Sequence, residues 1–200
     1  MPKLGMGPIR RKQLVAAAVA VIHERGFARA TVARIARQAG VSSGIVHHYF
    51  EDKDALLFAT MRALLAELRR ESVARLARAA GPAQRIVGLI EASFADSQFD
   101  EQVFSAWLAL YGNARHSAKL QRILLIYHAR LRSNLVHDLK KLVGHERAPG
   151  IADGIAAMID GLWLRYALTG KPSHVEEPRT LTRAYLWAVL GRDRVAPSRN

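Results

Sequence analysis

The chain has 200 residues, half of them hydrophobic, no cysteine, and a formal net charge of +13 at pH 7. This length and hydrophobic content suffice for one large or two small globular domains, and they exclude the fibrous and disordered classes. Without cysteine the chain has no disulfide framework, thiolate metal site or cysteine nucleophile. The charge is uneven, because residues 1–50 hold eight Lys and Arg residues against Glu24 alone. A basic surface can bind an anionic membrane or serve solubility, but its coincidence with the helix-turn-helix pattern described below favours nucleic acid.

The first predicted element is a helix over about residues 8–25, with Pro8 in its first turn and Gly26 ending it. Its buried stripe is Leu14, Ala18, Val21 and Ile22. The basic stretch before it lacks the apolar run of a signal peptide, and no segment approaches about 18 uninterrupted apolar residues. We therefore expect a soluble cytoplasmic protein with no membrane partner.

Two short helices joined by a tight turn are predicted over about residues 31–50. Thr31 is suited to cap the first helix, Gly40 to end it in the left-handed conformation, and Ser42 to cap the second. In the second helix Val46 and Phe50 lie four residues apart and point into the fold. Four small or polar residues share the opposite face: Ser43, Gly44, His47 and His48. This pattern predicts a helix-turn-helix whose second helix enters a DNA major groove; the alternative is a helical hairpin with a polar surface.

Arg34 is unusual because it lies three residues after the expected cap Thr31. A cation there opposes the helix dipole and costs a few tenths of a kcal/mol. A nearby DNA phosphate would reverse the sign, so Arg34 is a candidate DNA-binding residue. A solvated arginine on a well-packed helix is the alternative.

The order TVARIARQAGVSSGIVHHYF, followed by Lys53, Leu56 and Leu57, resembles the DNA-binding signature of the TetR family of bacterial repressors. The resemblance implies an all-α fold with a helix-turn-helix domain at residues 1–54 and a ligand-binding and dimerisation domain at 55–190. It also implies that one set of residues touches phosphates or bases of operator DNA: Thr31, Ser43, Gly44, Ile45, His47, His48, Tyr49 and Lys53.

The remaining sequence predicts helices only. A long helix is expected from Asp52 to about residue 79, with five further helices at about 83–96, 102–115, 117–143, 148–169 and 178–190. Residues 191–200 are expected to form a disordered tail.

The last two predicted helices carry apolar stripes wide enough for a homodimer with a four-helix interface. The stripes are Ile151, Ile155, Met158, Ile159, Leu162 and Tyr166 on one helix, and Leu181, Tyr185, Trp187, Ala188 and Val189 on the other. A symmetric dimer predicts a nearly palindromic operator.

Nothing in the C-terminal part predicts catalysis. It has no paired histidines at metal-ligand spacing and no glycine-rich phosphate loop, so we expect neither an enzyme nor a bound metal or cofactor. His47 and His48 are adjacent on a helix and point in different directions, which makes shared metal ligation improbable.

Aromatic residues recur at helical spacing in the C-terminal part, together with one carboxylate. They are Trp107, Tyr111, Tyr127 and Trp163, with Asp160 one turn before Trp163. Aromatic walls and a negative charge bind quaternary ammonium groups, at about 0.5–2 kcal/mol per ring. We therefore predict a small cationic effector; the alternative is that these aromatics are simply core.

Four further stretches resemble the choline-sensing branch of the same family: MPKLGM at the start, AWLAL at 106–110, IDGLWLR at 159–165 and LTRAYL at 181–186. The resemblance implies repression of genes for choline uptake and oxidation to glycine betaine, relieved by choline. His47 departs from that pattern, where serine is common, and this bears on the operator sequence. Two alternatives stay open: a repressor of a multidrug efflux pump that responds to lipophilic cations, and a nucleoid-type DNA packer.

Overall fold

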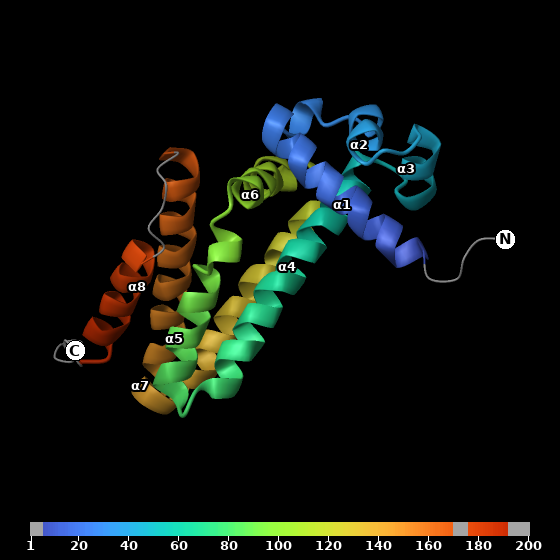
Figure 1. Cartoon of the computed structure of the whole chain (residues 1–200). Coiled ribbons are helices and arrows are strands. Elements are labelled where there is room, and N and C mark those ends of the chain that lie inside the picture. The colour runs from blue at the N-terminus through green and yellow to red at the C-terminus, as the bar shows by residue number, and fades with distance from the viewer. Residues whose placement is uncertain (1–5, 170–175, 192–200) are drawn as a thin grey trace. The chain divides into compact units, whose positions relative to one another are not determined.

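The computed structural model describes residues 6–169 and 176–191, and within them every regular element is a helix (Figure 1). The all-α prediction is confirmed. The predicted tail at 191–200 lies outside the described residues, apart from Gly191. No helix in the described part of the chain is long and apolar enough to cross a membrane.

The chain divides into two compact units. The first unit is Met1–Glu67 with Asp100–Tyr127, and the second unit is Leu68–Phe99 with His128–Asn200. The DNA-binding domain is predicted to end at residue 54, and this boundary stays a prediction.

The first unit is built from three helices at its start and one inserted later. The helices are α1 (Met6–Arg25), α2 (Val32–Gln38), α3 (Ser43–Tyr49) and α6 (Glu101–Asn113), with 3₁₀ turns η1 (Phe27–Arg29) and η3 (Ala114–His116). The unit also contains the start of α4 (Lys53–Arg78) and of α7 (Ala118–Thr169). Helix α1 begins two residues before the predicted position and packs against both α2 and α6.

The predicted apolar residues form the core of this unit. All four residues of the α1 stripe are buried, as are Val46 and Phe50. Leu56, Leu57 and Met61 on α4 are also buried. Burial of one α3 face leaves the opposite face of that helix in solvent, which sets up the functional site.

The second unit contains the rest of α4 and most of α7, with α5 (Pro82–Ser93), the turn η2 (Asp96–Gln98) and α8 (Glu176–Val189). Within α7 the backbone of Gly144 has φ 82° and ψ 173°, so the element is two helices separated by a sharp break. This agrees with the predicted separate helices at 117–143 and 148–169.

A part-buried ion pair joins α5 to α7. Asp138 is 1% exposed, and Arg85 Nε donates to both of its carboxylate oxygens at 3.0 Å. Lys141 Nζ lies 3.9 Å from the same carboxylate. At the other end of α5, Arg179 on α8 donates to the carbonyl oxygen of Phe94 from both Nε and Nη2.

The predicted dimerisation stripe is largely core of the second unit. Ile155, Ile159, Leu162 and Tyr166 are all at most 7% exposed within a single chain. The exposed apolar leucines of the two helices are Leu164, Leu168 and Leu181. The sequence alone could not separate the buried apolar residues from the exposed ones, since both sets follow helical spacing.

Candidate nucleic-acid interface

Two helix ends build the turn between α2 and α3. Thr31 caps α2, and its Oγ1 accepts from the Arg34 backbone N–H at 3.4 Å. Gly40 has φ 64°, a left-handed conformation that residues with a Cβ rarely adopt, and Val41 N–H then donates to the Ala36 carbonyl. The predicted cap and turn are confirmed, and they form the helix-turn-helix.

Ser42 is in the N-cap position of α3 but its hydroxyl forms no capping bond. In a capped helix the Ile45 N–H would donate to the Ser42 hydroxyl. Here it donates to the Ser42 carbonyl at 3.1 Å. The predicted side-chain bond is therefore wrong, although the predicted helix start is right.

The outward face of α3 is the one that the sequence predicts. Ser43, Gly44, His47 and His48 are exposed. Ile45 and Tyr49 are half-buried at its edge, and the rings of His48 and Tyr49 meet edge-on at 5.2 Å. A short exposed helix with hydroxyl and imidazole groups can present donors and acceptors to base edges in a major groove.

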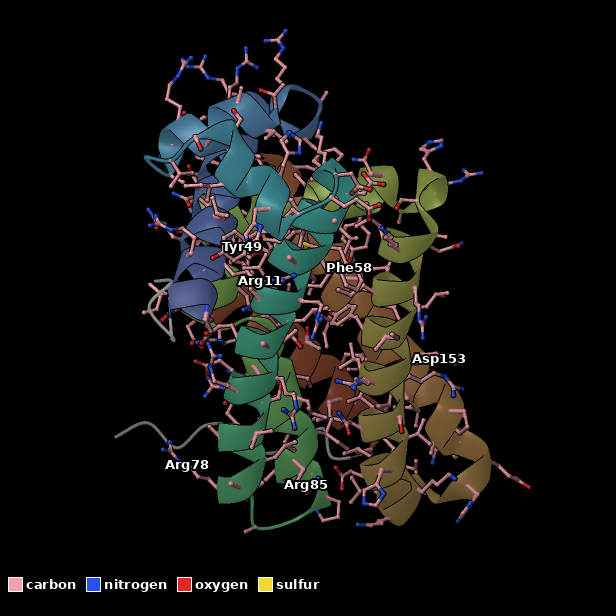
Figure 2. All side chains as sticks on the ribbon, turned by 90° about the vertical axis from the view of Figure 1, so that its right-hand side faces the viewer. Arg11, Tyr49, Phe58, Arg78, Arg85 and Asp153 are labelled. Carbon is pink, nitrogen blue, oxygen red and sulfur yellow. The ribbon has the colours of Figure 1, made fainter. Side chains whose placement is uncertain are left out.

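The orientation of α3 depends on α1 as well as on its own core. Gln13 Nε2 donates to the Ala39 carbonyl at the end of α2, at 2.7 Å. The Arg11 guanidinium lies 5.0 Å from the centre of the Phe50 ring, just after α3 (Figure 2). Sequence reasoning missed Gln13 and Arg11 because their partners lie far along the chain and no periodicity links them.

Lys53 is the first residue of α4, and its side chain contacts the segment before α2. Its Nζ donates to the Ala28 carbonyl at 3.2 Å and lies 4.1 Å from the centre of the Phe27 ring. Burial lowers the pKa of the Lys53 ammonium, and Asp54 acts in the opposite direction. The ammonium has further N–H donors, so the predicted phosphate contact is compatible with these bonds and stays a prediction.

Arg34 Nη1 donates to the Arg29 carbonyl at 2.7 Å. This bond gives the unusual cation at the start of α2 a structural partner that neither sequence interpretation included. Thr31 and Arg34 are both exposed, and the guanidinium retains donors that can reach a phosphate. With Arg25, Arg29 and Arg37, also exposed, Arg34 makes this end of the first unit strongly positive.

Three of the five predicted effector residues meet in the first unit. The Trp107 ring centre lies 5.9 Å from that of Tyr111 on the same helix and 5.1 Å from that of Tyr127 on α7. Trp107 is 4% exposed, and the two tyrosines are half-buried.

Asp160 and Trp163 lie in the second unit. Trp163 is 7% exposed, and its indole N–H donates to the Gln98 carbonyl at 3.3 Å. Asp160 Oδ2 lies 3.1 Å from His128 Nε2, a partner that the sequence did not suggest. Among the described residues no group of three or more His, Asp or Glu side chains is arranged to hold a metal ion.

A helix-turn-helix with an exposed second helix, set in a basic surface, defines a DNA-binding protein. Residues 14–60 match the family model "Bacterial regulatory proteins, tetR family", and residues 82–191 match "BetI-type transcriptional repressor, C-terminal". The chain belongs to the TetR family of transcriptional regulators and is a repressor of the BetI type.

Individual relatives agree with this assignment. The chain is 47% identical over 190 residues to the HTH-type transcriptional regulator BetI of Rhizobium meliloti (strain 1021), covering 95% of this chain and 94% of that one. A putative transcriptional regulator from Pseudomonas aeruginosa PAO1 has a similar structure, with TM-score 0.82, 26% identity, and coverage of 94% and 93%. A putative regulator from Saccharomonospora viridis, solved in complex with choline, has TM-score 0.74, 22% identity, and coverage of 88% and 94%.

These findings confirm the predicted family, the TetR-like fold and the role in transcription. The relatives are regulators and not enzymes, as the sequence predicted.

Proposed function

We propose that this repressor controls genes for choline transport and for oxidation of choline to glycine betaine, and that choline releases it from its operator. It acts in the cytoplasm, where the operator DNA is, as a homodimer on a nearly palindromic site. No cofactor is needed, because the effector changes only the equilibrium between DNA-binding states.

The observation that carries the choline proposal is the cluster of Trp107, Tyr111 and Tyr127. A quaternary nitrogen cannot donate a hydrogen bond, so a site for it must offer ring faces and a nearby negative charge. The ring centres of Tyr111 and Tyr127 each lie within 6 Å of the Trp107 ring centre. Asp160 and Trp163, the other two predicted effector residues, belong to the second unit, and substitution tests whether each contributes to choline binding.

Two comparisons support the same effector. The BetI-type model covers residues 82–191. This range includes every proposed effector residue and none of the proposed DNA-binding residues. The Saccharomonospora viridis regulator holds choline on a fold of the same kind. Its low identity carries no residue roles, so the assignment of individual side chains rests on the chemistry above.

The DNA half of the proposal rests on the exposed face of α3. In a symmetric dimer two such helices lie about one turn of DNA apart or somewhat more, which requires a nearly palindromic operator. Specificity over random DNA at about 150 mM salt separates a repressor from a DNA packer, because non-specific binding fades steeply with salt.

The test titrates choline while following both tryptophan fluorescence and operator release. Trp187→Phe serves as the parent protein, since it leaves Trp107 and Trp163 as the only reporters. Choline should change the fluorescence and release the DNA over the same concentration range. Ethanolamine, which is more strongly hydrated, and glycine betaine, which carries its own carboxylate, should act at much higher concentrations.

Variants then test the residues. Asp160→Asn and Tyr127→Ala should abolish both responses and leave operator affinity unchanged, whereas Asp153→Asn, a matched exposed carboxylate on the same helix, should respond normally. Release by a lipophilic cation such as tetraphenylphosphonium, but not by choline, would replace this proposal by the efflux-pump alternative. A normal choline response in Asp160→Asn would show that Asp160 does not contribute to choline binding.

A further inference from the structure

A second basic surface lies in the first unit, away from the helix-turn-helix. Residues 115–122, which follow α6, carry four exposed basic or imidazole side chains: Arg115, His116, Lys119 and Arg122. The sequence has no Asp or Glu from residue 102 to residue 137, so the segment that carries this surface contains no acidic residue of its own. We call these four residues the η3–α7 basic surface.

The opposite side of this segment is anchored in the core. Ala114 is 6% exposed, Leu120 is 0% exposed and Ile123 is 5% exposed. The start of α7 is closed by a bond from the Gln121 N–H to the Ser117 carbonyl at 2.9 Å. The charges therefore stand on a packed, amphipathic turn, which fixes their direction better than a free loop would.

One contact places this surface beside the DNA-reading element. Lys119 Nζ lies 4.0 Å from Asp52 Oδ2, and Asp52 also accepts from the Ala55 N–H at the start of α4. Asp52 follows Phe50, the first residue after α3, by two positions. Figure 2 shows α2, α3 and the turn between α6 and α7 at the same end of the first unit.

The charges near the end of α3 make this position significant. Glu51, Asp52 and Asp54 follow α3 directly and would repel a DNA phosphate. Lys119 and Asp52 are each about half exposed, so their ion pair contributes little stability and can be exchanged for a phosphate at low cost. The basic surface can therefore reverse the local repulsion.

We propose that the η3–α7 basic surface binds DNA phosphates outside the groove that α3 reads. The inference rests on the proposed operator binding and extends it: the protein contacts a longer stretch of DNA than its helix-turn-helix alone. The surface adds affinity and salt dependence without adding base preference, because phosphates carry no sequence information.

The test removes three charges by Arg115→Gln, Lys119→Gln and Arg122→Gln in one protein. The control removes three exposed charges elsewhere, by Arg69→Gln, Arg78→Gln and Lys140→Gln. Operator affinity is measured against salt concentration on two duplexes, one with long flanks and one trimmed to the palindrome. The slope of log K against log salt is negative, and each lost phosphate contact should reduce its magnitude by about 0.9.

On the long duplex the first variant should bind at least about 10-fold more weakly than the control. The salt slope should be smaller in magnitude by about two to five, because each of the two protomers loses one to three contacts of about 0.9 each. On the trimmed duplex the two should bind alike. Hydroxyl-radical protection of the wild type should extend beyond the palindrome, and the variant should lose that extension. Unchanged melting temperatures of both proteins establish that they are folded.

Equal affinities and slopes of variant and control on the long duplex would overturn the inference, since only the overall charge would then matter. An equal loss on the long and trimmed duplexes would also overturn it, because the contact would then lie inside the palindrome. A wild type without preference for the operator over random DNA would instead refute the proposed function. That result is read from the wild type alone, so the two failures are distinguishable.

Discussion

The Nδ1 atom of His23, near the end of α1, lies 3.0 Å from the Oγ of Ser105 on α6. The Ser105 hydroxyl already donates to the Glu101 carbonyl of its own helix at 2.9 Å. With the hydroxyl hydrogen directed to Glu101, Nδ1 is the donor in the bond to Ser105. This bond joins the helix that supports α3 to the helix that carries Trp107 and Tyr111, within one compact unit.

We predict that Ser105→Ala weakens the transmission of choline binding to DNA release. The change removes two hydrogen bonds, the one to His23 and the one to the Glu101 carbonyl within α6, each worth about 0.5–1.5 kcal/mol. Operator affinity without choline should change by less than about threefold. The loss of operator affinity on adding choline should be smaller than in the wild type, measured by fluorescence anisotropy of labelled operator with and without saturating choline.

Ser72→Ala is the matched control. Its hydroxyl also donates to a carbonyl of its own helix, that of Leu68, at 2.8 Å. It should leave the effect of choline unchanged. If Ser105→Ala shows the full wild-type release, the α1–α6 contact does not carry the signal, and the start of α4 becomes the candidate.

The helix-turn-helix could be predicted because its determinants are local. Thr31, Gly40 and Val46 act on residues within a few positions, and the helical spacing identifies the buried side of α3. The partners of Asp138 and Trp163 could not be predicted, because Arg85 and Gln98 lie 53 and 65 residues away along the chain. Such pairs depend on how helices pack, which periodicity does not encode.

The caps of α2 and α3 give a second prediction. Thr31→Ala removes a real, if long, capping bond of 3.4 Å and should lower the free energy of unfolding by about 0.5–1 kcal/mol. Ser42→Ala removes no such bond and should cost less than about 0.5 kcal/mol. Urea denaturation without DNA measures both, and a larger cost for Ser42→Ala would contradict the described geometry.

The Arg85–Asp138 pair gives a third prediction. Arg85→Met leaves the Asp138 carboxylate, 1% exposed, with Lys141 at 3.9 Å as its remaining basic partner in the described contacts. Loss of one partner of a fully buried pair costs about 3–5 kcal/mol. The Arg85 side chain is 36% exposed and Lys141 remains beside Asp138, so we expect a smaller cost of about 1–3 kcal/mol. Thermal and urea denaturation measure it.

Two further variants make that result interpretable. Arg132→Met breaks an exposed pair with Asp153, whose side chain is 55% exposed, and should cost less than about 1 kcal/mol. The double variant Arg85→Met with Asp138→Leu should be more stable than Arg85→Met alone, because no buried charge remains. A double variant as unstable as the single one would show that packing, and not the charge, sets the cost.

The last prediction concerns the proposed homodimer and the leucines that the second unit leaves exposed. Leu164, Leu168 and Leu181 are 39%, 66% and 41% exposed. Ala157, Gly161, Leu164 and Leu168 are all exposed at helical spacing along one face of α7. Small residues beside large apolar ones allow two helices to approach closely, so this face is suited to a two-fold interface with α8.

Leu168→Glu with Leu181→Glu should give folded monomers, because two-fold symmetry places four carboxylates in one interface. Leu125→Glu with Ile126→Glu changes a similarly exposed apolar pair in the first unit and should remain dimeric. Leu162→Glu should instead unfold the protein, since Leu162 is 7% exposed. Sedimentation velocity at micromolar concentration measures the mass, and the monomers should lose specific operator binding because one α3 helix reads only half of the site. A monomeric wild type would refute the dimer, and a dimeric Leu168→Glu, Leu181→Glu protein would place the interface on another face.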